Sequence, residues 1–268
     1  MATRAEELLE AGRLGDAVKA QTEEVRARPA DRQARFVLFE LLCLAGDLER
    51  APRQLDALAV GASPAAELRT RLCRSLVAAE GERRAVWSGS ARPLLAPDAP
   101  ATLEGRIAAL GRLREGDREG AARRLAEASA AAVSVAGRIN EQPFEQIRDT
   151  DELGASVLEV FAQGRCLWLS FEQLRRLEID APRSLLDLVW APARLWDARG
   201  NESLVHLPTL YAGTHEEQDD RLRLGRVTEW AERAGVMRGI GQKVLLTAAG
   251  DREDEWSLLD VRSLEVAT

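Results

Sequence analysis

One short pattern of residues occurs twice near the start of the chain, 34 positions apart. It covers residues 5–17 around Gly12 and returns in register over residues 39–51 around Gly46. Weaker copies surround two further glycines, Gly81 and Gly116. Glycine supplies the left-handed turn that ends a helix, and the small or apolar residue five positions later lets the next helix pack closely. The pattern therefore predicts antiparallel helical hairpins over the first half of the chain.

A period of 34 residues is typical of the tetratricopeptide repeat, a helix–turn–helix unit. A single unit cannot bury its own apolar face, so such units stack and share a core. Prolines at residues 93, 97 and 100 predict a loop over 88–100, because proline removes backbone donors and fixes φ. We expect all-α, tetratricopeptide-like hairpins with helices over 3–27, 31–60, 63 to about 81, 101–115 and 117–132.

Charge and tryptophan content divide the chain into two parts. Residues 1–137 carry 21 Lys and Arg against 20 Asp and Glu, whereas residues 138–268 carry 16 against 24, a net charge of −8. Five of the six tryptophans also follow residue 138. This change predicts two domains, 1–137 and 138–268. An acidic second domain argues against nucleic-acid binding, which needs a basic face.

The second domain carries short runs of strand-forming residues between turn signals, which predict a mostly antiparallel sheet or a small barrel. Apolar spacing adds two helices, over residues 153–161 and 219–234. The expected fold class is therefore multidomain, with helical hairpins followed by a smaller α+β domain. The strands are expected at 166–171, 177–179, 188–196, 204–207, 244–247 and 256–261.

The chain carries no signal-peptide pattern and no apolar stretch of about 18 residues that could span a membrane. Its cysteines, Cys43, Cys73 and Cys166, lie in apolar patterns without CxxC spacing. An odd number of such cysteines is typical of reduced thiols in a protein core. These features predict a cytoplasmic protein that does not bind membranes.

No set of residues predicts catalysis. The two histidines, His206 and His215, lie beside acidic residues, but their spacing matches no metal-ligand signature. We expect a solvated acidic loop there, and neither a metal, a cofactor nor an enzyme activity. The alternative is an enzyme or a sensor of small ligands, with a pocket around His206, Tyr211 and Glu229.

Six residues of the second domain are candidates for partner binding, because tryptophan, tyrosine and arginine dominate binding hot spots. Arg226, Glu229 and Trp230 are expected on adjacent turns of one helix. The alternative is that Trp230 fills the core while Arg226 and Glu229 form a surface pair. The other candidates stand at rigid, proline-marked strand ends, which are either core or rim: Trp190, Pro208 and Tyr211.

Taken in order, the motifs of the second half resemble the ImpE/SciE family, also called TagJ. The match opens with Gly137 to Gly154, which includes Asp149-x-Asp151-x-Leu153-Gly154, and closes with Leu259-Asp260-x-Arg262. The chain departs from the pattern at Gln146, where tryptophan is expected, and at Cys166-Leu167, where a tyrosine pair is preferred. Between these ends lie 185–193, Leu207-Pro208-Thr209-x-Tyr211-x-Gly213, Arg226-Val-Thr228-Glu229-Trp230 and Gly239-Ile-Gly241-Gln242.

The resemblance implies a cytoplasmic, non-enzymatic adaptor of the bacterial type VI secretion system. Members are understood to bind the small subunit of the contractile sheath through a helix near that subunit's N-terminus. The family is also linked to the AAA+ ATPase that disassembles the contracted sheath. A general tetratricopeptide scaffold unrelated to secretion is a further alternative.

Overall fold

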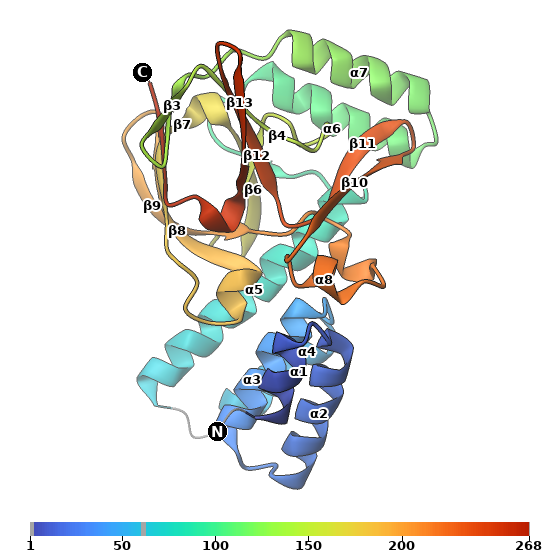
Figure 1. The fold of residues 1–268 in the computed structure, drawn as a ribbon, viewed down its shortest axis with the longest axis vertical. Helices are drawn as coiled ribbons and strands as arrows, with labels where there is room; N and C mark the ends of the chain where they lie inside the picture. Colours follow the sequence, from blue (N-terminus) through green and yellow to red (C-terminus); the bar gives the residue numbers. More distant parts are fainter. Residues whose placement is uncertain (1–2, 60–62, 268) are drawn as a thin grey trace.

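The computed structural model describes residues 3–59 and 63–267, and it is helical in its first half and rich in strands in its second (Figure 1). Helices α1–α4 form a bundle at one end, and α5 runs from this bundle to the strands. Helices α6 and α7 lie at the opposite end of the molecule. The bounds are α1 (Arg4–Glu10), α2 (Leu14–Ala27), α3 (Arg32–Leu44), α4 (Arg50–Ala59), α5 (Pro64–Trp87), α6 (Ala101–Arg114) and α7 (Arg118–Ala130).

Glycine turns end three of these helices as the repeat predicts. Gly12, Gly46 and Gly116 have φ values of +74°, +72° and +79°. In each turn, the amide of the following residue donates to a carbonyl five residues earlier, at 2.8–2.9 Å. This is the hydrogen bond of a Schellman cap, which a residue with a left-handed backbone allows. The local part of the repeat prediction is therefore confirmed at these three glycines.

The fourth glycine, Gly81, does not end a helix. It lies inside α5, which ends at Trp87, and Gly89 follows two residues later with φ of +71°. A glycine inside a helix costs only about 1 kcal/mol, and residues after Gly81 are anchored on the strands, so packing outweighs that cost. The expected third hairpin is thus a single helix of 24 residues, and a regular tetratricopeptide array is not confirmed.

Fourteen strands lie in the part of the chain that the structure describes. Nine form one sheet in the order β1-β6-β5-β9-β8-β7-β14-β2-β3, three form a second sheet (β13-β12-β4), and β10–β11 is a hairpin. All pairs are antiparallel except β1–β6. The predicted antiparallel sheet is confirmed. The predicted alternative, a small barrel, is not confirmed, because the strand order begins at β1 and ends at β3 without closing. The bounds are β1 (Leu94–Leu95), β2 (Gly137–Ile139), β3 (Gln142–Phe144), β4 (Gln146–Asp149), β5 (Val157–Ala162), β6 (Arg165–Ser170), β7 (Leu174–Ile179), β8 (Trp190–Asp197), β9 (Glu202–Pro208), β10 (Thr228–Arg233), β11 (Val236–Gly241), β12 (Val244–Ala249), β13 (Arg252–Ser257) and β14 (Ser263–Val266).

The helix predicted over 153–161 is wrong. Residues 152–156 form turns, and Val157–Ala162 is strand β5, which lies between β6 and β9. A short apolar run does not distinguish a buried strand from a buried helix by its periodicity. Here burial on both faces decides for the strand, because every residue from Val157 to Phe161 is buried.

The helix predicted over 219–234 is also wrong. Only one turn forms, α8 (Asp220–Arg223), and Gly225 follows it with φ of +64°. A Cβ at Gly225 would lie 2.9 Å from Leu210 Cδ2, so the close packing also favours glycine there. The chain then enters the β10–β11 hairpin, whose two-residue turn has positive φ at both Ala234 and Gly235, as a type I′ turn requires.

The first half and the second half share a hydrophobic core. One buried cluster joins Leu42 of α3 and Val86 of α5 to Trp168 of β6 and Trp190 of β8. A second cluster lies among the strands and includes Leu245 of β12. The division at residue 137 remains our proposal for the domain boundary, and the two parts are packed against each other through the first cluster.

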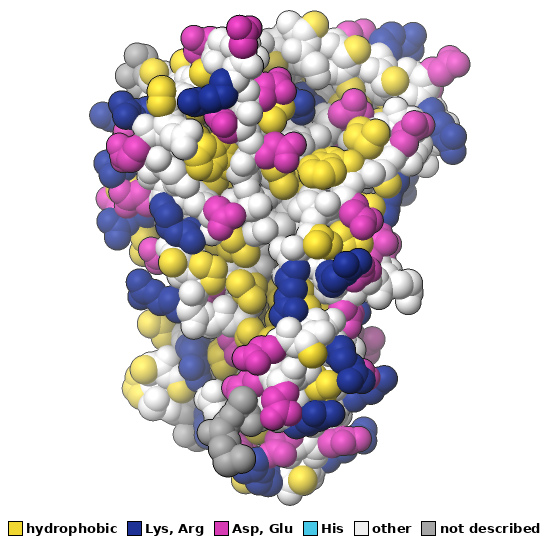
Figure 2. Space-filling model, viewed as in Figure 1, with side chains coloured by type: hydrophobic (Ala, Val, Ile, Leu, Met, Phe, Trp, Pro, Cys, Tyr) yellow, Lys and Arg dark blue, Asp and Glu magenta, His cyan; other side chains and the backbone are white. Residues whose placement is uncertain are grey.

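The surface carries charges of both signs. Figure 2 shows acidic and basic side chains interspersed on one face, with hydrophobic side chains gathered over the β10–β11 hairpin. In the described ranges, no helix combines the length and the apolar character that crossing a bilayer requires.

We predict that Ala51→Leu destabilises the fold by about 1–3 kcal/mol, because added methylenes overpack a tight helix contact. Ala51 is 0% exposed and lies five residues after the Gly46 turn. Ala57→Leu, on the exposed side of the same helix, is the matched control. Urea unfolding followed by circular dichroism measures both, and equal stabilities of the two variants would contradict the close helix packing.

Candidate functional site

Glu159 is a charged residue in the middle of the apolar strand β5. Side chains alternate along a strand, so Glu159 shares a face with Val157 and Phe161, which belong to the core shared with the helices. Leu158 and Val160 point to the other core. The side chain of Glu159 is fully buried, and a buried carboxylate is tolerated only when it is paired and hydrogen-bonded.

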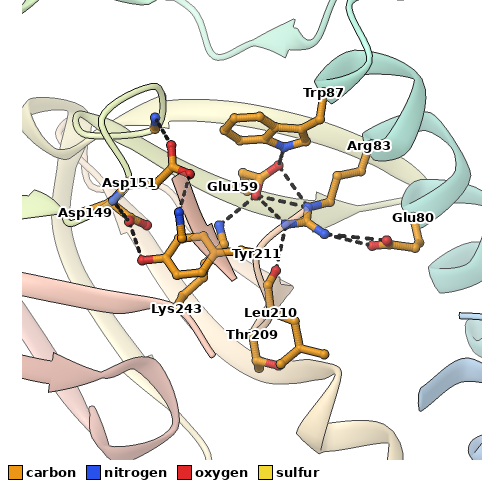
Figure 3. Close-up of polar contacts among 12 residues, drawn as sticks. Glu80, Arg83, Trp87, Asp149, Asp151, Glu159, Thr209, Leu210, Tyr211 and Lys243 are labelled. Atoms are coloured by element: carbon orange, nitrogen blue, oxygen red, sulfur yellow. Dashed lines mark hydrogen bonds and ion pairs between the residues drawn. The ribbon is translucent and has the colours of Figure 1, made fainter. Parts of the chain in front are cut away.

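Its partners come from α5 and from Lys243, the residue just before β12 (Figure 3). Arg83 Nε lies 3.0 Å from each carboxylate oxygen of Glu159, Lys243 Nζ donates to Oε2 at 2.6 Å, and the indole of Trp87 donates to Oε1. Arg83 Nη1 also lies 3.4 Å from Glu80. We call Glu80, Arg83, Glu159 and Lys243 the α5 charge cluster. It ties the long helix to the strands.

Electrostatics keep the carboxylate of Glu159 ionised. Burial opposes the charge on Glu159, but Arg83 and Lys243, with hydrogen bonds from Lys243 and Trp87, outweigh it and lower the pKa to about 2. The cavity beside Glu159 measures only about 10 Å³, room for no more than about one water molecule. The cluster is therefore a structural joint and not a pocket for a ligand.

A second polar group extends from this joint to the surface. Tyr211 donates its hydroxyl proton to Asp149 Oδ1 at 2.7 Å, and the same hydroxyl accepts from the amide of Val244 at 3.0 Å. Thr150 Oγ1 lies 2.9 Å from the Tyr211 hydroxyl and accepts from Trp230 Nε1 at 3.2 Å. These contacts connect buried Asp149 to the half-exposed indole of Trp230.

The β10–β11 hairpin is held on this group by Asp151. Its carboxylate accepts from Arg238 Nε at 2.7 Å, from the amide of Gly239 at 3.0 Å and from the amide of Gly154 at 3.0 Å. A Cβ at Gly239 would lie 2.3 Å from the ring of Tyr211, so glycine is required for this approach. The hairpin thus has a defined position relative to the core.

Burial raises the pKa of Asp149 to about 7, with the Asp151 charge adding to the rise and Lys243 opposing it. The folded protein therefore holds this proton more tightly than the unfolded chain, whose aspartates titrate near 3.8. By linkage, the stabilising contribution is complete below about pH 4 and is lost as the pH rises through about 7.

We predict that the wild-type free energy of unfolding decreases between pH 5 and pH 8 more steeply than that of Asp149→Asn. Asparagine keeps the shape of the side chain but cannot lose a proton. Urea titrations at both pH values measure the slopes, and the difference between the two proteins removes contributions from the histidines. Parallel pH profiles would show that Asp149 does not titrate in this range.

The structure places three of the six predicted partner-binding residues in the interior. Trp190 is 1% exposed and Tyr211 is 4% exposed, and Pro208 is buried at the end of β9. Trp190 Nε1 reaches Glu80 of the α5 charge cluster at 3.5 Å. The sequence left two positions open for these residues, core or rim, and the structure buries all three. Their role in binding a partner remains a prediction.

Arg226, Glu229 and Trp230 do not share a helix, which corrects that expectation. Arg226 lies in a loop and donates to the carbonyls of Glu10 and Leu9 at 3.0 and 2.7 Å, so it caps the end of α1. Glu229 and Trp230 are neighbours in strand β10 and point to opposite faces of the hairpin. Their role in binding a partner remains a prediction, and Trp230 is the strongest of these three candidates.

Trp230 has an apolar neighbour on the hairpin. Trp230 pairs with Gly239, and Glu232 pairs with Met237; directly opposed residues share a face, so Trp230 and Met237 lie diagonally on one face. They are 42% and 38% exposed. We call Trp230 and Met237 the hairpin pair.

The histidines lie apart from one another in the fold. His206 is in β9 opposite Pro192 and Phe161. His215 packs on Gly46, and a Cβ added to Gly46 would lie only 2.4 Å from the Cβ of His215. Burial lowers the pKa of both. The small cavity beside Tyr211 is lined by His215 but by neither His206 nor Glu229. In the described ranges, no group of three His, Cys, Asp or Glu could hold a metal ion.

Sequence reasoning missed the α5 charge cluster, although two signals pointed to it. Glu159 interrupts the apolar run 157–161, and Lys243 is one of only two lysines in a chain with 37 Lys and Arg. Neither signal identifies the residue that pairs with Glu159, because the partners are distant in sequence. Arg83 lies 76 positions before Glu159, and Lys243 lies 84 positions after it.

Comparisons with known proteins agree with the family resemblance of the sequence motifs. A family described as ImpE protein matches residues 141–265. A protein of Pseudomonas aeruginosa named type VI secretion system accessory component TagJ is 40% identical over 262 residues, covering 97% of this chain and 90% of that protein. The crystal structure of protein VPA1032 from Vibrio parahaemolyticus has the same fold, with a TM-score of 0.89, 24% identity, and coverage of 99% of this chain and 98% of that one.

Proposed function

This chain belongs to the ImpE family, and from that membership we propose that it is an accessory component of a type VI secretion system. The P. aeruginosa relative that carries this description matches almost the whole chain, so the proposal covers both the helical and the strand-rich parts. We propose further that the protein works without enzymatic activity, in the cytoplasm, as an adaptor.

The partner that we propose is a helix near the N-terminus of the small subunit of the contractile sheath. The observation that carries a binding role is the hairpin pair, because Trp230 is a large ring left 42% exposed although its indole nitrogen is fixed by Thr150. An exposed tryptophan in a fixed position loses little conformational entropy when it binds, which is why tryptophan dominates hot spots.

The charges beside the hairpin pair favour a basic partner. Glu232 is exposed and opposes Met237 across the hairpin, and the carboxylate of Glu152 accepts from the backbone amide of Met237 at 2.7 Å. An amphipathic helix with an apolar stripe and flanking Lys or Arg would complement this surface. The bound adaptor would then connect the sheath to the AAA+ ATPase that disassembles it.

Isothermal titration calorimetry tests the proposal with the full chain and a synthetic peptide of the sheath helix from the same organism. We expect saturable binding that weakens as salt increases, because screening reduces attraction between exposed charges. A peptide of the same composition in scrambled order is the control. Equal heats for both peptides, or no binding of the sheath helix, would contradict the adaptor role.

A second experiment addresses the ATPase. We expect the adaptor, loaded with the sheath peptide, to retain the purified ATPase on an affinity column. Retention of the ATPase by the sheath peptide alone, unchanged when the adaptor is added, would remove the proposed link while leaving sheath binding intact.

A further inference from the structure

A groove of about 470 Å³ lies on the face of the β10–β11 hairpin opposite to the hairpin pair. Arg233 and Arg238 share this face, because Arg238 is paired with Ala231, two positions before Arg233. Trp230 and Met237 lie on the other face. The last turn of α5 and the loop between β9 and α8 complete the walls. The aromatic, imidazole and charged residues of the lining are Arg84, Trp87, His215, Glu216, Arg233 and Arg238.

The lining of this groove carries an excess of positive charge. Three arginines face one carboxylate, that of Glu216, which gives a sum of +2, although the chain as a whole carries −7. Burial lowers the pKa of His215, and the charge of Arg84 acts in the same direction while Glu216 opposes it, so the imidazole adds no negative or positive charge at pH 7. The groove is a basic region on an acidic protein.

Carboxylates outside the lining hold two of these arginines in place. Asp151 accepts from Arg238 Nε at 2.7 Å, and Glu80 accepts from Arg84 Nε at 3.2 Å. Both carboxylates are buried, and neither lines the groove. Arg238 Cζ also lies 4.9 Å from the ring of Trp87. A guanidinium fixed on one side by a carboxylate presents its remaining N–H groups in a defined direction, because the group is planar and rigid.

The remaining nitrogens of these arginines are open to solvent. Nη1 and Nη2 of Arg238 and Nη2 of Arg84 make no hydrogen bond to any described residue, and none of these three atoms is buried. The side chain of Arg233 is 46% exposed, and only its Nη2 is bound, to Glu217 at 2.5 Å. Helix α5 and the hairpin thus supply accessible guanidinium donors to one groove.

The donors indicate the kind of partner. Guanidinium groups bind carboxylates through paired N–H donors, and arginines from two separate elements match several spaced carboxylates better than one small anion. Pockets for small molecules are mostly apolar, unlike this groove. We propose that the groove binds an acidic segment of a partner protein, whose Glu or Asp side chains contact Arg84, Arg233 and Arg238. The two faces of the hairpin would then receive partners of opposite charge, and this second site does not depend on sheath binding.

A fluorescein-labelled hexapeptide of glutamates and the matching hexapeptide of glutamines are the probes. We expect the full chain at low salt to bind the glutamate peptide saturably, as fluorescence anisotropy measures, and added salt to weaken this binding because exposed charges are screened. The glutamine peptide should not bind. Inorganic phosphate should compete poorly, since one anion cannot contact all three arginines. Equal binding of the two peptides, or displacement of the glutamate peptide by phosphate at equal concentration, would overturn the proposal.

Two variants of opposite sign test the placement. Arg233→Gln removes an accessible cation and should weaken binding of the glutamate peptide about threefold to fivefold, the effect of an exposed ion pair. Glu216→Gln removes the carboxylate of the lining and should strengthen binding about twofold, a gain that damage to the fold cannot produce. Arg26→Gln and Glu23→Gln make the same charge changes at exposed positions of α2 and should alter the affinity less. Unchanged affinity in both groove variants, or equal changes in the α2 variants, would overturn the assignment.

Discussion

Replacing Glu159 with glutamine is expected to destabilise the fold by about 3–5 kcal/mol, because it leaves buried cations without their counter-charge. Glutamine keeps the volume of the side chain, so the loss is electrostatic. Arg83 retains Glu80 at 3.4 Å, whereas Lys243 loses the only carboxylate within ion-pair distance among the described residues. Urea unfolding at pH 7 measures the change in the free energy of unfolding.

The matched control, Glu82, lies on α5 next to Arg83. Glu82 accepts from Arg165 of β6 at 2.8 Å, but the pair is partly exposed, and such pairs contribute about 1 kcal/mol or less. Glu82→Gln should therefore change stability little. If Glu159→Gln fails to fold, Lys243→Met, which leaves Glu159 paired with Arg83, provides a milder variant. A Glu159→Gln protein as stable as Glu82→Gln would show that the α5 charge cluster does not join the helix to the strands.

Glu159 of the same cluster makes the stability of the fold depend on pH in acid. Glu159 has a folded pKa of about 2, below the ordinary value of 4.5. The stabilisation from its ionised form is therefore complete above about pH 4.5 and is lost as the pH falls toward 2. This is opposite to the contribution of Asp149, which is lost as the pH rises.

Replacing Trp230 with alanine is expected to weaken binding of the sheath helix by about 2 kcal/mol, or roughly thirtyfold in Kd. The indole is half exposed and contributes one hydrogen bond to the fold, to Thr150, so the effect on binding should exceed the effect on folding. Calorimetry with the sheath peptide measures the affinity, and thermal unfolding measures stability.

Leu204→Ala is the control for this prediction, because Leu204 is another exposed apolar residue, 79% exposed on β9, outside the hairpin pair. It should leave the affinity unchanged, whereas Met237→Ala should reduce it. The variants belong in the full chain, since one buried cluster joins the helices to the strands and separate fragments would expose it. Unchanged affinity in both Trp230→Ala and Met237→Ala would move the partner site away from the hairpin.

The sequence determined those features whose physical cause is local. The helix ends at Gly12, Gly46 and Gly116 were predictable, because the left-handed turn and its hydrogen bond lie within about six residues. The change from helical hairpins to short strands near residue 137 was predictable for the same reason, since periodicity and turn residues are read within a short window. The family resemblance also came from the order of the motifs alone.

Only the tertiary structure decided features that depend on distant partners. Whether Gly81 ends a helix depended on the strands beneath α5. Whether residues 157–161 form a strand depended on β9, where His206 pairs with Phe161 from 45 positions later in the chain. Strand β12 pairs Leu245 with Asp149, and this pairing brings Lys243 to Glu159. The four residues of the α5 charge cluster meet because the fold buries them together, and no spacing along the chain encodes that meeting.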